Sequence, residues 1–513
     1  MVGATIHRGV TQTALAREVD PGHHRGHGSP WTAPAHIGDR TRPMSTESDF
    51  PAAGLRPDQL NTMDLTISTI GNIGPGIDFY FGFGVIVATA GLGAPLTIVA
   101  AAVAVALLGV TVTAFTRAEP SAGSFITYVE SAFGRTAGTA IAQLVAIGYT
   151  VAMAGVITMA GGFIAMALAA ATGVHIPWVL LTVVIALAAL ALMVGGVKLS
   201  TRTVGVAVSV QVLVMLVVCV LAMVENASHL TLAPFRWSSV TGGLAGLSAG
   251  FPLALYMFIG WENALPLAEE ARDPRRSIPR SLFISLAITT VLFVLFSYAT
   301  IVGSKGQVGS IGRSSIPFLT VASTVLGPFG WMAWVAGIVS IVATLLAGTT
   351  SQARMLFDGG RERMLPSRLG TVHPTTGTPA AALITVIASG LALIGIWGVS
   401  HLLGVGTGHM DPVGLYAECS TFGTIIILAV YAATTVSLPV FIRRHHAEQF
   451  SPVRHVVVPL LGLVALMVPF VELFAPGQPA PYDVFPYLAL LVIAAVGVLA
   501  TVVTRRTRSS TRP

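Results

Sequence analysis

Residues 63–89 read MDLTISTIGNIGPGIDFYFGFGVIVAT, a mainly apolar stretch that is long enough to cross a lipid bilayer. Its centre holds Gly74-Pro75-Gly76, and Asp78 follows two residues later. Proline removes a backbone donor and clashes with the preceding turn, while glycine adopts dihedral angles that other residues avoid. We therefore expect the helix to break here. The break indicates either a functional site, since an ionisable residue accompanies it, or a proline kink in a packed helix.

The composition of the whole chain agrees with a membrane protein. Of 513 residues, 28 are Lys or Arg and 22 are Asp or Glu, so 10% are charged, against about 25% in soluble domains. Hydrophobic residues make up 54%. Too few charges remain to cover a folded surface in water. The composition therefore predicts a membrane protein and excludes an ordinary soluble one. The long apolar spans of the chain predict the all-α class.

Charges and Pro/Gly clusters divide the chain into about twelve predicted transmembrane helices. The spans are expected near 63–89, 93–116, 137–170, 177–196, 203–224, 241–266, 281–303, 327–356, 379–398, 413–436, 456–473 and 484–504. Residues 1–62 have no apolar signal-peptide core and are predicted to form a disordered cytoplasmic tail, in which Met44 is an alternative start. Residues 505–513 are predicted to form a cytoplasmic C-terminal tail.

The basic residues are distributed unevenly over the predicted loops. With the N-terminus placed in the cytoplasm, 25 of the 28 lie inside, and only Arg236, Lys305 and Arg313 lie outside. This bias is the positive-inside pattern of membrane proteins, so both termini are predicted to be cytoplasmic. Because the cations serve topology, we expect no nucleic-acid partner. Abundant Arg, Ala, Val and Gly are typical of a GC-rich bacterium, which indicates the plasma membrane.

Four acidic residues remain near or inside the predicted spans. Asp64 and Glu418 lie near span ends, where a solvated side chain is the simpler interpretation. Asp78 and Glu262 lie within spans, and Glu262 follows Phe258-Ile259-Gly260-Trp261. Carboxyl groups inside a membrane are costly and mark functional sites by default. Both residues therefore become candidates.

The two interrupted spans are the first and the sixth, five spans apart. Paired broken helices of this kind are typical of transporters built from inverted repeats. The predicted domains are a first five-helix repeat over 63–224, a second over 225–436 and two additional transmembrane helices over 437–504.

Three segments carry a family resemblance. They are FIGWENALPLAEEARDPRRSIPRS (258–281), PSAGSFITYVESAFGR (120–135) and SQARMLFDGGRERMLPSRLGTVHPTTGTP (351–379). Together they resemble the amino acid–polyamine–organocation family of permeases, whose loops after helices 2, 6 and 8 carry such motifs. The resemblance covers roughly residues 60–445.

The resemblance implies a five-plus-five inverted repeat with broken helices 1 and 6, followed by two further helices. It implies a secondary active transporter that works by alternating access, without ATP. We also expect no cofactor and no enzyme activity, because the sequence has no Walker A or HExxH motif. The substrate would be a small molecule, an amino acid or a related amine. A same-fold permease for another organic solute, such as a nucleobase or an organic amine, is the alternative.

The resemblance also places the substrate between the two breaks. Backbone N–H groups of the second half-helix would hold a carboxylate, and the carbonyl groups of residues 257–259 would accept from an ammonium group. The predicted substrate-binding residues are Gly74, Pro75, Gly76, Ile77, Asp78, Tyr256, Met257, Phe258, Ile259 and Gly260. Pro75 departs from the family pattern because it supplies no donor. Asp78 is interpreted as an N-cap, as a partner of a substrate ammonium group, or as the carrier of a coupling proton.

Glu262 is predicted either to carry a coupling proton or to organise the second break structurally. Tyr256 is either an aromatic lid or a packing residue. Proton coupling and substrate exchange are favoured, and sodium coupling stays open. Hydroxyl groups for sodium are available in the eighth span at Ser340, Thr344, Thr349, Thr350 and Ser351, and Gln211 is the most polar residue of the fifth span. Histidines lack metal-ligand spacing, so no metal site is predicted.

Overall fold

The computed structural model describes residues 60–121, 123–196, 201–403, 410–472, 474, 476 and 480–510. Within these ranges the chain is helical, and its only strand-like pairing is a parallel bridge between Leu60 and Ala271. A helix satisfies its own backbone hydrogen bonds, which is the condition for crossing lipid. The predicted all-α class is therefore confirmed. The predicted N-terminal tail up to residue 59, with Met44, lies outside the described residues.

The first part of the described chain contains seven α-helices. Helix α1 spans Thr62–Ile73, α2 Pro75–Ala90, α3 Ala94–Ala118, α4 Phe125–Phe133, α5 Arg135–Thr172, α6 Trp178–Val194 and α7 Thr201–Glu225. The remainder contains nine. They are α8 Leu244–Tyr256, α9 Pro274–Gly303, α10 Val308–Ile311, α11 Pro317–Leu326, α12 Trp331–Arg361, α13 Ala380–Leu402, α14 Pro412–His445, α15 Val458–Glu472 and α16 Phe485–Ser510.

Nine segments of the described residues are long and apolar enough to cross a membrane. One of them, Thr62–Ala118, includes α1, α2 and α3 in succession. Shorter apolar helices occupy Trp178–Val194, Pro317–Phe329 and Val453–Met467. A multi-pass membrane protein follows from these lengths and compositions.

Several segments predicted as loops are helical. Helix α9 begins at Pro274, so Arg275, Arg276 and Arg280 lie in its first turns rather than in a loop. Proline is favoured at the first position of a helix, where its missing N–H would have no partner. Helix α4 occupies part of the predicted loop 120–135, and α14 continues to His445. These predicted ends were wrong because the helices continue past the charged residues that end their apolar parts.

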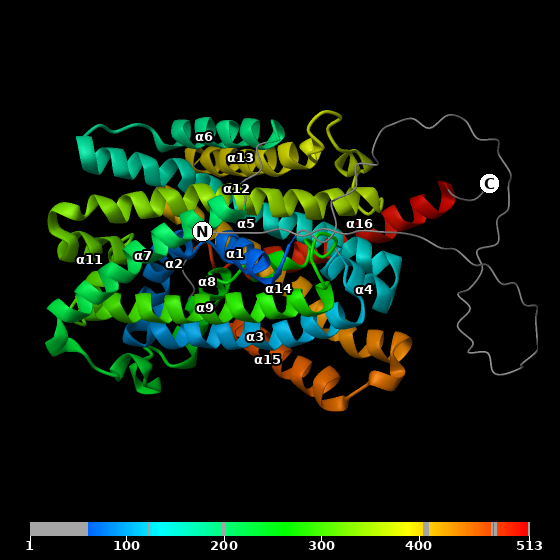
Figure 1. Ribbon diagram of the computed structural model, residues 1–513, viewed down its shortest axis with the longest axis horizontal. Helices are drawn as coiled ribbons and strands as arrows, with labels where there is room; N and C mark the ends of the chain where they lie inside the picture. Colours follow the sequence, from blue (N-terminus) through cyan, green and yellow to red (C-terminus); the bar gives the residue numbers. More distant parts are fainter. Residues whose placement is uncertain are drawn as a thin grey trace, which may run out of the picture. The chain divides into compact units, whose positions relative to one another are not determined.

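Helix α5 lies at the centre of the bundle. It packs against α14, α6, α12, α4, α13 and α16 (Figure 1). Glycines make these approaches possible: a Cβ at Gly148 would lie 2.9 Å from Ile427, and one at Gly161 would lie 2.1 Å from the backbone of Thr182. Small residues at such contacts are the usual means of close helix packing in lipid. Two of these neighbours, α12 and α14, in turn pack against α1, α2 and α8, the helices next to the two breaks.

Candidate functional site

The first break separates α1 from α2 at Gly74. This residue has φ 66° and ψ 66°, ends α1 by donating its N–H to the Ile70 carbonyl at 3.0 Å, and starts α2. The left-handed region suits glycine because there is no Cβ to clash. Pro75 then takes the first position of α2, where its missing N–H costs nothing. The predicted break at Gly74-Pro75-Gly76 is thus present.

The N–H groups at the start of α2, which have no partner within the helix, donate to side chains of two other helices. Gly76 N donates to Oε1 of Gln211 from α7 at 3.3 Å, and Ile77 N donates to Oγ of Ser340 from α12 at 2.8 Å. These are the donors that the family resemblance assigns to a substrate carboxylate. In this conformation they are satisfied within the protein. A ligand carboxylate would have to displace Gln211 or Ser340 to reach them.

Asp78 is buried, with 3% of its surface exposed. Its Oδ1 accepts a hydrogen bond from the phenol of Tyr416, on α14, at 3.2 Å. The N-cap interpretation is wrong, because Gly74 occupies the cap position and the cap has no side-chain hydrogen bond. Asp78 lies one turn into α2 instead, and its own N–H donates to the Gly74 carbonyl at 3.1 Å. The carboxyl group is thereby directed between helices.

Tyr256, the last residue of α8, extends this cluster. Its ring meets that of Tyr416 edge to face, with centroids 5.7 Å apart. Its hydroxyl donates to the Ala152 carbonyl on α5 at 3.5 Å. Residues from α2, α5, α8 and α14 therefore meet around Asp78.

The second break follows α8. Met257, Phe258 and Ile259 form turns, Gly260 adopts φ 101°, and a short 3-10 helix covers Trp261–Ala264. The Phe258 carbonyl accepts from Trp261 N at 3.0 Å. A Cβ at Gly260 would lie 3.1 Å from the backbone nitrogen of Ile73. The two breaks are therefore in backbone contact, and only glycine fits at their junction.

Glu262 is 1% exposed and connects the second break to α5. Oε1 accepts from the Tyr149 hydroxyl, and Oε2 accepts from Gly260 N at 3.1 Å. The neighbouring Trp261 donates its indole N–H to the Tyr431 hydroxyl on α14 at 3.3 Å. Buried polar groups that are satisfied in this way hold one geometry.

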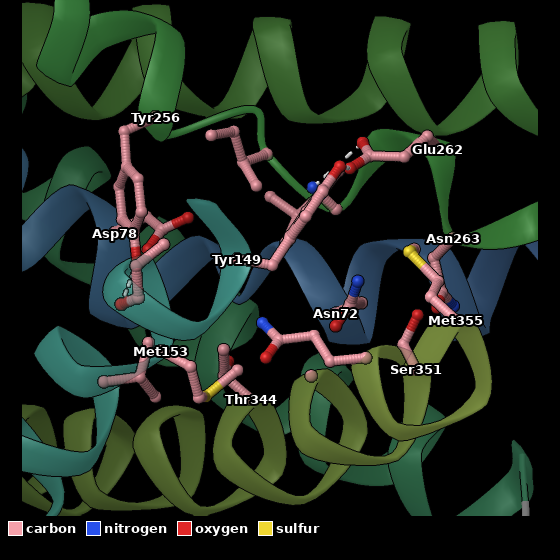
Figure 2. Close-up of a pocket in the computed structure, with 17 residues that line it drawn as sticks. Asn72, Asp78, Tyr149, Met153, Tyr256, Glu262, Asn263, Thr344, Ser351 and Met355 are labelled. Carbon is pink, nitrogen blue, oxygen red and sulfur yellow. Dashed lines mark hydrogen bonds between the residues drawn. The ribbon is translucent and has the colours of Figure 1, made fainter. Parts of the chain in front are cut away.

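A cavity of about 40 Å³ lies between the breaks (Figure 2). Figure 2 shows Asp78 and Tyr256 near each other, with Tyr149 reaching towards Glu262. Small-molecule sites usually enclose about 300–1,000 Å³. In this conformation the cavity has room for a few water molecules, so binding a substrate requires the helices to move apart.

Predicted site residues divide into two groups around this cavity. Those that line it are Asp78, Tyr256, Ile259, Gly260 and Glu262. Those outside its lining are Gly74, Pro75, Gly76, Ile77, Met257 and Phe258. The second group shapes the two breaks. The ring of Phe258, for example, packs against that of Phe293, with the ring centroids 5.3 Å apart.

Other lining residues were missed in the sequence, namely Asn72, Tyr149, Met153, Asn263, Gln352 and Met355. Tyr149 and Met153 lie on α5, outside the quoted motifs. The other four lie within quoted stretches, but their residue types gave no signal of a site, and only the tertiary structure brings all six together. Of the hydroxyl residues predicted on α12, Thr344 and Ser351 line the cavity, while Thr350 donates back to the Leu346 carbonyl at 2.7 Å.

Three buried oxygen atoms in the lining have no hydrogen-bond partner among the described residues. They are Oγ1 of Thr344, Oγ of Ser351 and Oε1 of Gln352, all on α12. A buried polar atom without a partner is costly, which favours a ligand or water at this wall. The cavity thus combines two buried carboxyl groups with polar atoms available for new hydrogen bonds.

Sequence comparison finds transporters that are similar to this chain. Branched-chain amino acid permease BcaP of Bacillus subtilis is 28% identical over 63% of this chain and 71% of its own length. Methylthioribose transporter of the same organism is 26% identical over 72% of this chain and 82% of its own length. Asc-type amino acid transporter 1 of Mus musculus is 28% identical over 32% of this chain and 30% of its own length.

These relatives are transporters of small organic molecules. The family model described as amino acid permease matches residues 60–496 and therefore includes both breaks, the cavity and nearly every described helix. This match confirms the resemblance to the amino acid–polyamine–organocation permeases. The chain belongs to the amino acid permease family.

Proposed function

We propose that this permease is a secondary active transporter that moves amino acids or related amines across the plasma membrane by alternating access. The observation that carries the proposal is the contact between the two helix breaks at a cavity with two buried carboxyl groups, Asp78 and Glu262. Membrane transporters use such breaks at mid-membrane to expose backbone and ionisable groups to a substrate. Asp78 is the proposed partner of the substrate amine.

The proposed architecture has twelve spans in a five-plus-five inverted repeat with two further helices, and both termini in the cytoplasm. In such repeats the breaks after α1 and after α8 would lie in corresponding positions, and the presence of both breaks supports this arrangement. The helices bearing the breaks would rock against α5 and α12. The small volume between them supports a movement of this kind, since the cavity must widen to admit a substrate.

Coupling to a proton or to the exchange of two substrates is proposed, with Glu262 or Asp78 as the proton carrier. Glu262 accepts from Tyr149 and Gly260 across the second break. Gain or loss of a proton there would change those two bonds and so favour one arrangement of the break over another. Sodium coupling is the alternative, because Thr344 on α12 lies close to Gly74 and its hydroxyl has no partner among the described residues.

A second candidate substrate class comes from the comparisons. The methylthioribose transporter matches a larger share of this chain than the branched-chain amino acid permease does. A small organic solute other than an amino acid is therefore the second proposal.

Uptake into proteoliposomes tests both proposals. The purified full chain would be offered labelled branched-chain, cationic and small neutral amino acids, amines and methylthioribose, with imposed proton or sodium gradients or internal unlabelled substrate. We expect one class of amino acids or amines to accumulate inside the vesicles, driven by an inward proton gradient or by exchange, and we expect no response to sodium. Uptake of methylthioribose alone supports the second proposal, and uptake of no compound contradicts both.

A further inference from the structure

Four arginines line a second pocket, away from the transport cavity. Its volume is about 410 Å³, and its lining consists of Arg117, Arg275, Arg276 and Arg280. Arg117 lies in the last turn of α3, and the other three lie in the first two turns of α9. Helices α3 and α9 run side by side (Figure 1). Residues far apart in the sequence therefore bring four like charges to one place.

These charges are poorly compensated. Arg276 Nε lies 3.7 Å from Asp273 Oδ2, and both side chains are largely exposed. Arg275 donates to the Ala118 carbonyl at 3.5 Å. Within the described part of the chain, no carboxylate lies within 4.0 Å of Arg117 or Arg280. The nearest acids in sequence, Glu119 and Asp273, are exposed.

The arrangement is unfavourable without an anion. The N-terminus of α9 carries a partial positive charge, which repels cations in its first turns. Arg276 and Arg280 are four residues apart, a spacing at which like charges on a helix repel. The positive-inside pattern requires basic residues on one side of the membrane but not their convergence from two helices. A bound anion removes both repulsions, and guanidinium groups are well suited to phosphate.

The surface beside the pocket is apolar. Along α9, directly after Arg280, the side chains of Phe283, Ile284 and Ile288 are 37%, 44% and 41% exposed. In a membrane this face of α9 meets lipid acyl chains. On the proposed orientation, the pocket faces the cytoplasmic leaflet, whose surface is negatively charged. We propose that the pocket binds the phosphate group of an anionic phospholipid, with the acyl chains lying along α9.

Native mass spectrometry of the delipidated full chain tests this proposal. The protein would be titrated with phosphatidylglycerol, with phosphatidylcholine and with inorganic phosphate. The test variant combines Arg117→Gln with Arg280→Gln, and a second variant, Arg117→Lys with Arg280→Lys, keeps the charges. The matched control combines Arg363→Gln with Arg368→Gln, two exposed arginines outside the pocket.

We expect preferential binding of phosphatidylglycerol to the wild type. One basic residue near an anionic surface contributes about fivefold in affinity, so the double Gln variant should bind about 25-fold more weakly, with the control unchanged. An equal loss in the control would overturn the proposal. Equal affinity for phosphatidylcholine, or saturable binding of inorganic phosphate without lipid preference, would also overturn it.

A measurement on the wild type covers the case in which the double Gln variant fails to fold. Phosphatidylglycerol added to the detergent-solubilised protein should raise the unfolding temperature more than phosphatidylcholine does. The Lys variant, which keeps the charges but loses the bidentate geometry of Arg, should show a smaller rise. Equal unfolding temperatures with the two lipids would overturn the proposal.

Discussion

The hydroxyl of Tyr416 donates a hydrogen bond to Oδ1 of Asp78 at 3.2 Å, and both residues are buried. The bond joins α14 to the half-helix that starts at the first break. It fixes the direction of a carboxyl group that lines the cavity. A substrate amine that reaches Asp78 therefore meets a carboxyl group already oriented by the protein.

Replacing Tyr416 by phenylalanine tests how much the hydrogen bond to Asp78 contributes to substrate binding. Tyr416→Phe keeps the ring contact with Tyr256 and removes only the donor. A hydrogen bond to a charged group contributes about 1.5–3 kcal/mol, so the apparent KM of uptake should rise about 10- to 100-fold. Tyr487→Phe, at a 59% exposed position on α16, is the control. An unchanged KM in Tyr416→Phe would show that the bond does not orient the binding group.

The bond from Tyr149 to Glu262 predicts an energetic coupling between these residues. Tyr149→Phe should lower the free energy of unfolding by about 1–3 kcal/mol, since a buried carboxyl group loses a donor. Glu262→Gln should also be destabilising. Because the two residues share the bond, the double variant should lose less than the sum of the single losses. Additive losses in thermal or denaturant unfolding would contradict a direct interaction.

The geometry at Gly74 predicts a sharp difference between two alanine substitutions. Gly74→Ala places a side chain in the left-handed region, at a cost of about 1–2 kcal/mol, and its Cβ would lie 2.0 Å from Oγ1 of Thr344. Gly173→Ala has a similar φ of 73° but meets nothing within 4 Å. Both variants should lose stability, but only Gly74→Ala should also lose uptake. Equal uptake in the two variants would contradict a role for the contact between the first break and α12.

The ion pair between Arg354 of α12 and Glu270 joins α12 to the segment that follows the second break, with Nη1 and Oε1 3.2 Å apart. The side chains are 31% and 18% exposed, so the pair should contribute no more than about 1 kcal/mol to stability. Even that amount changes the ratio of two conformations about fivefold. Glu270→Gln should therefore increase the reaction of Ser351→Cys, a cavity position, with a charged maleimide.

The labelling experiment needs a background without the native thiols, Cys219 and Cys419. Asp273→Asn is the matched control, because it breaks an exposed pair with Arg276 at 3.7 Å. Labelling that rises equally in Glu270→Gln and Asp273→Asn would indicate a general effect of charge removal. It would contradict the expectation that the pair between Arg354 and Glu270 specifically favours the conformation in which the cavity is closed.

The positions of both breaks were predictable because their causes are local. Glycine at Gly74 and Gly260 permits the positive φ, and Pro75 has no N–H to place in the helix. The burial of Asp78 and Glu262 was also predictable, because a carboxyl group within an apolar span is costly in lipid and is placed inside the helix bundle.

The partners of these carboxyl groups were not predictable. Tyr149 lies in the interior of α5 and Tyr416 in the second turn of α14, two long apolar helices in which a tyrosine is equally suited to packing. Which tyrosine meets which carboxyl group depends on how α5 and α14 pack against the broken helices. The predicted start of the span at residue 281 was also too late, since α9 begins at Pro274. The basic first turns of α9 have the composition of a loop.

The most direct test of the central claim is the initial rate of uptake by Asp78→Asn in proteoliposomes, for the substrate that the wild type accumulates. Glu418→Gln is the control, since Glu418 accepts from Trp397 at 2.8 Å and lies outside the cavity lining. If Asp78 binds the substrate amine or carries the proton, its loss should lower the rate about tenfold or more, while the control keeps the wild-type rate. A wild-type rate in Asp78→Asn would contradict the assignment of Asp78 as the partner of the substrate amine or the carrier of the proton.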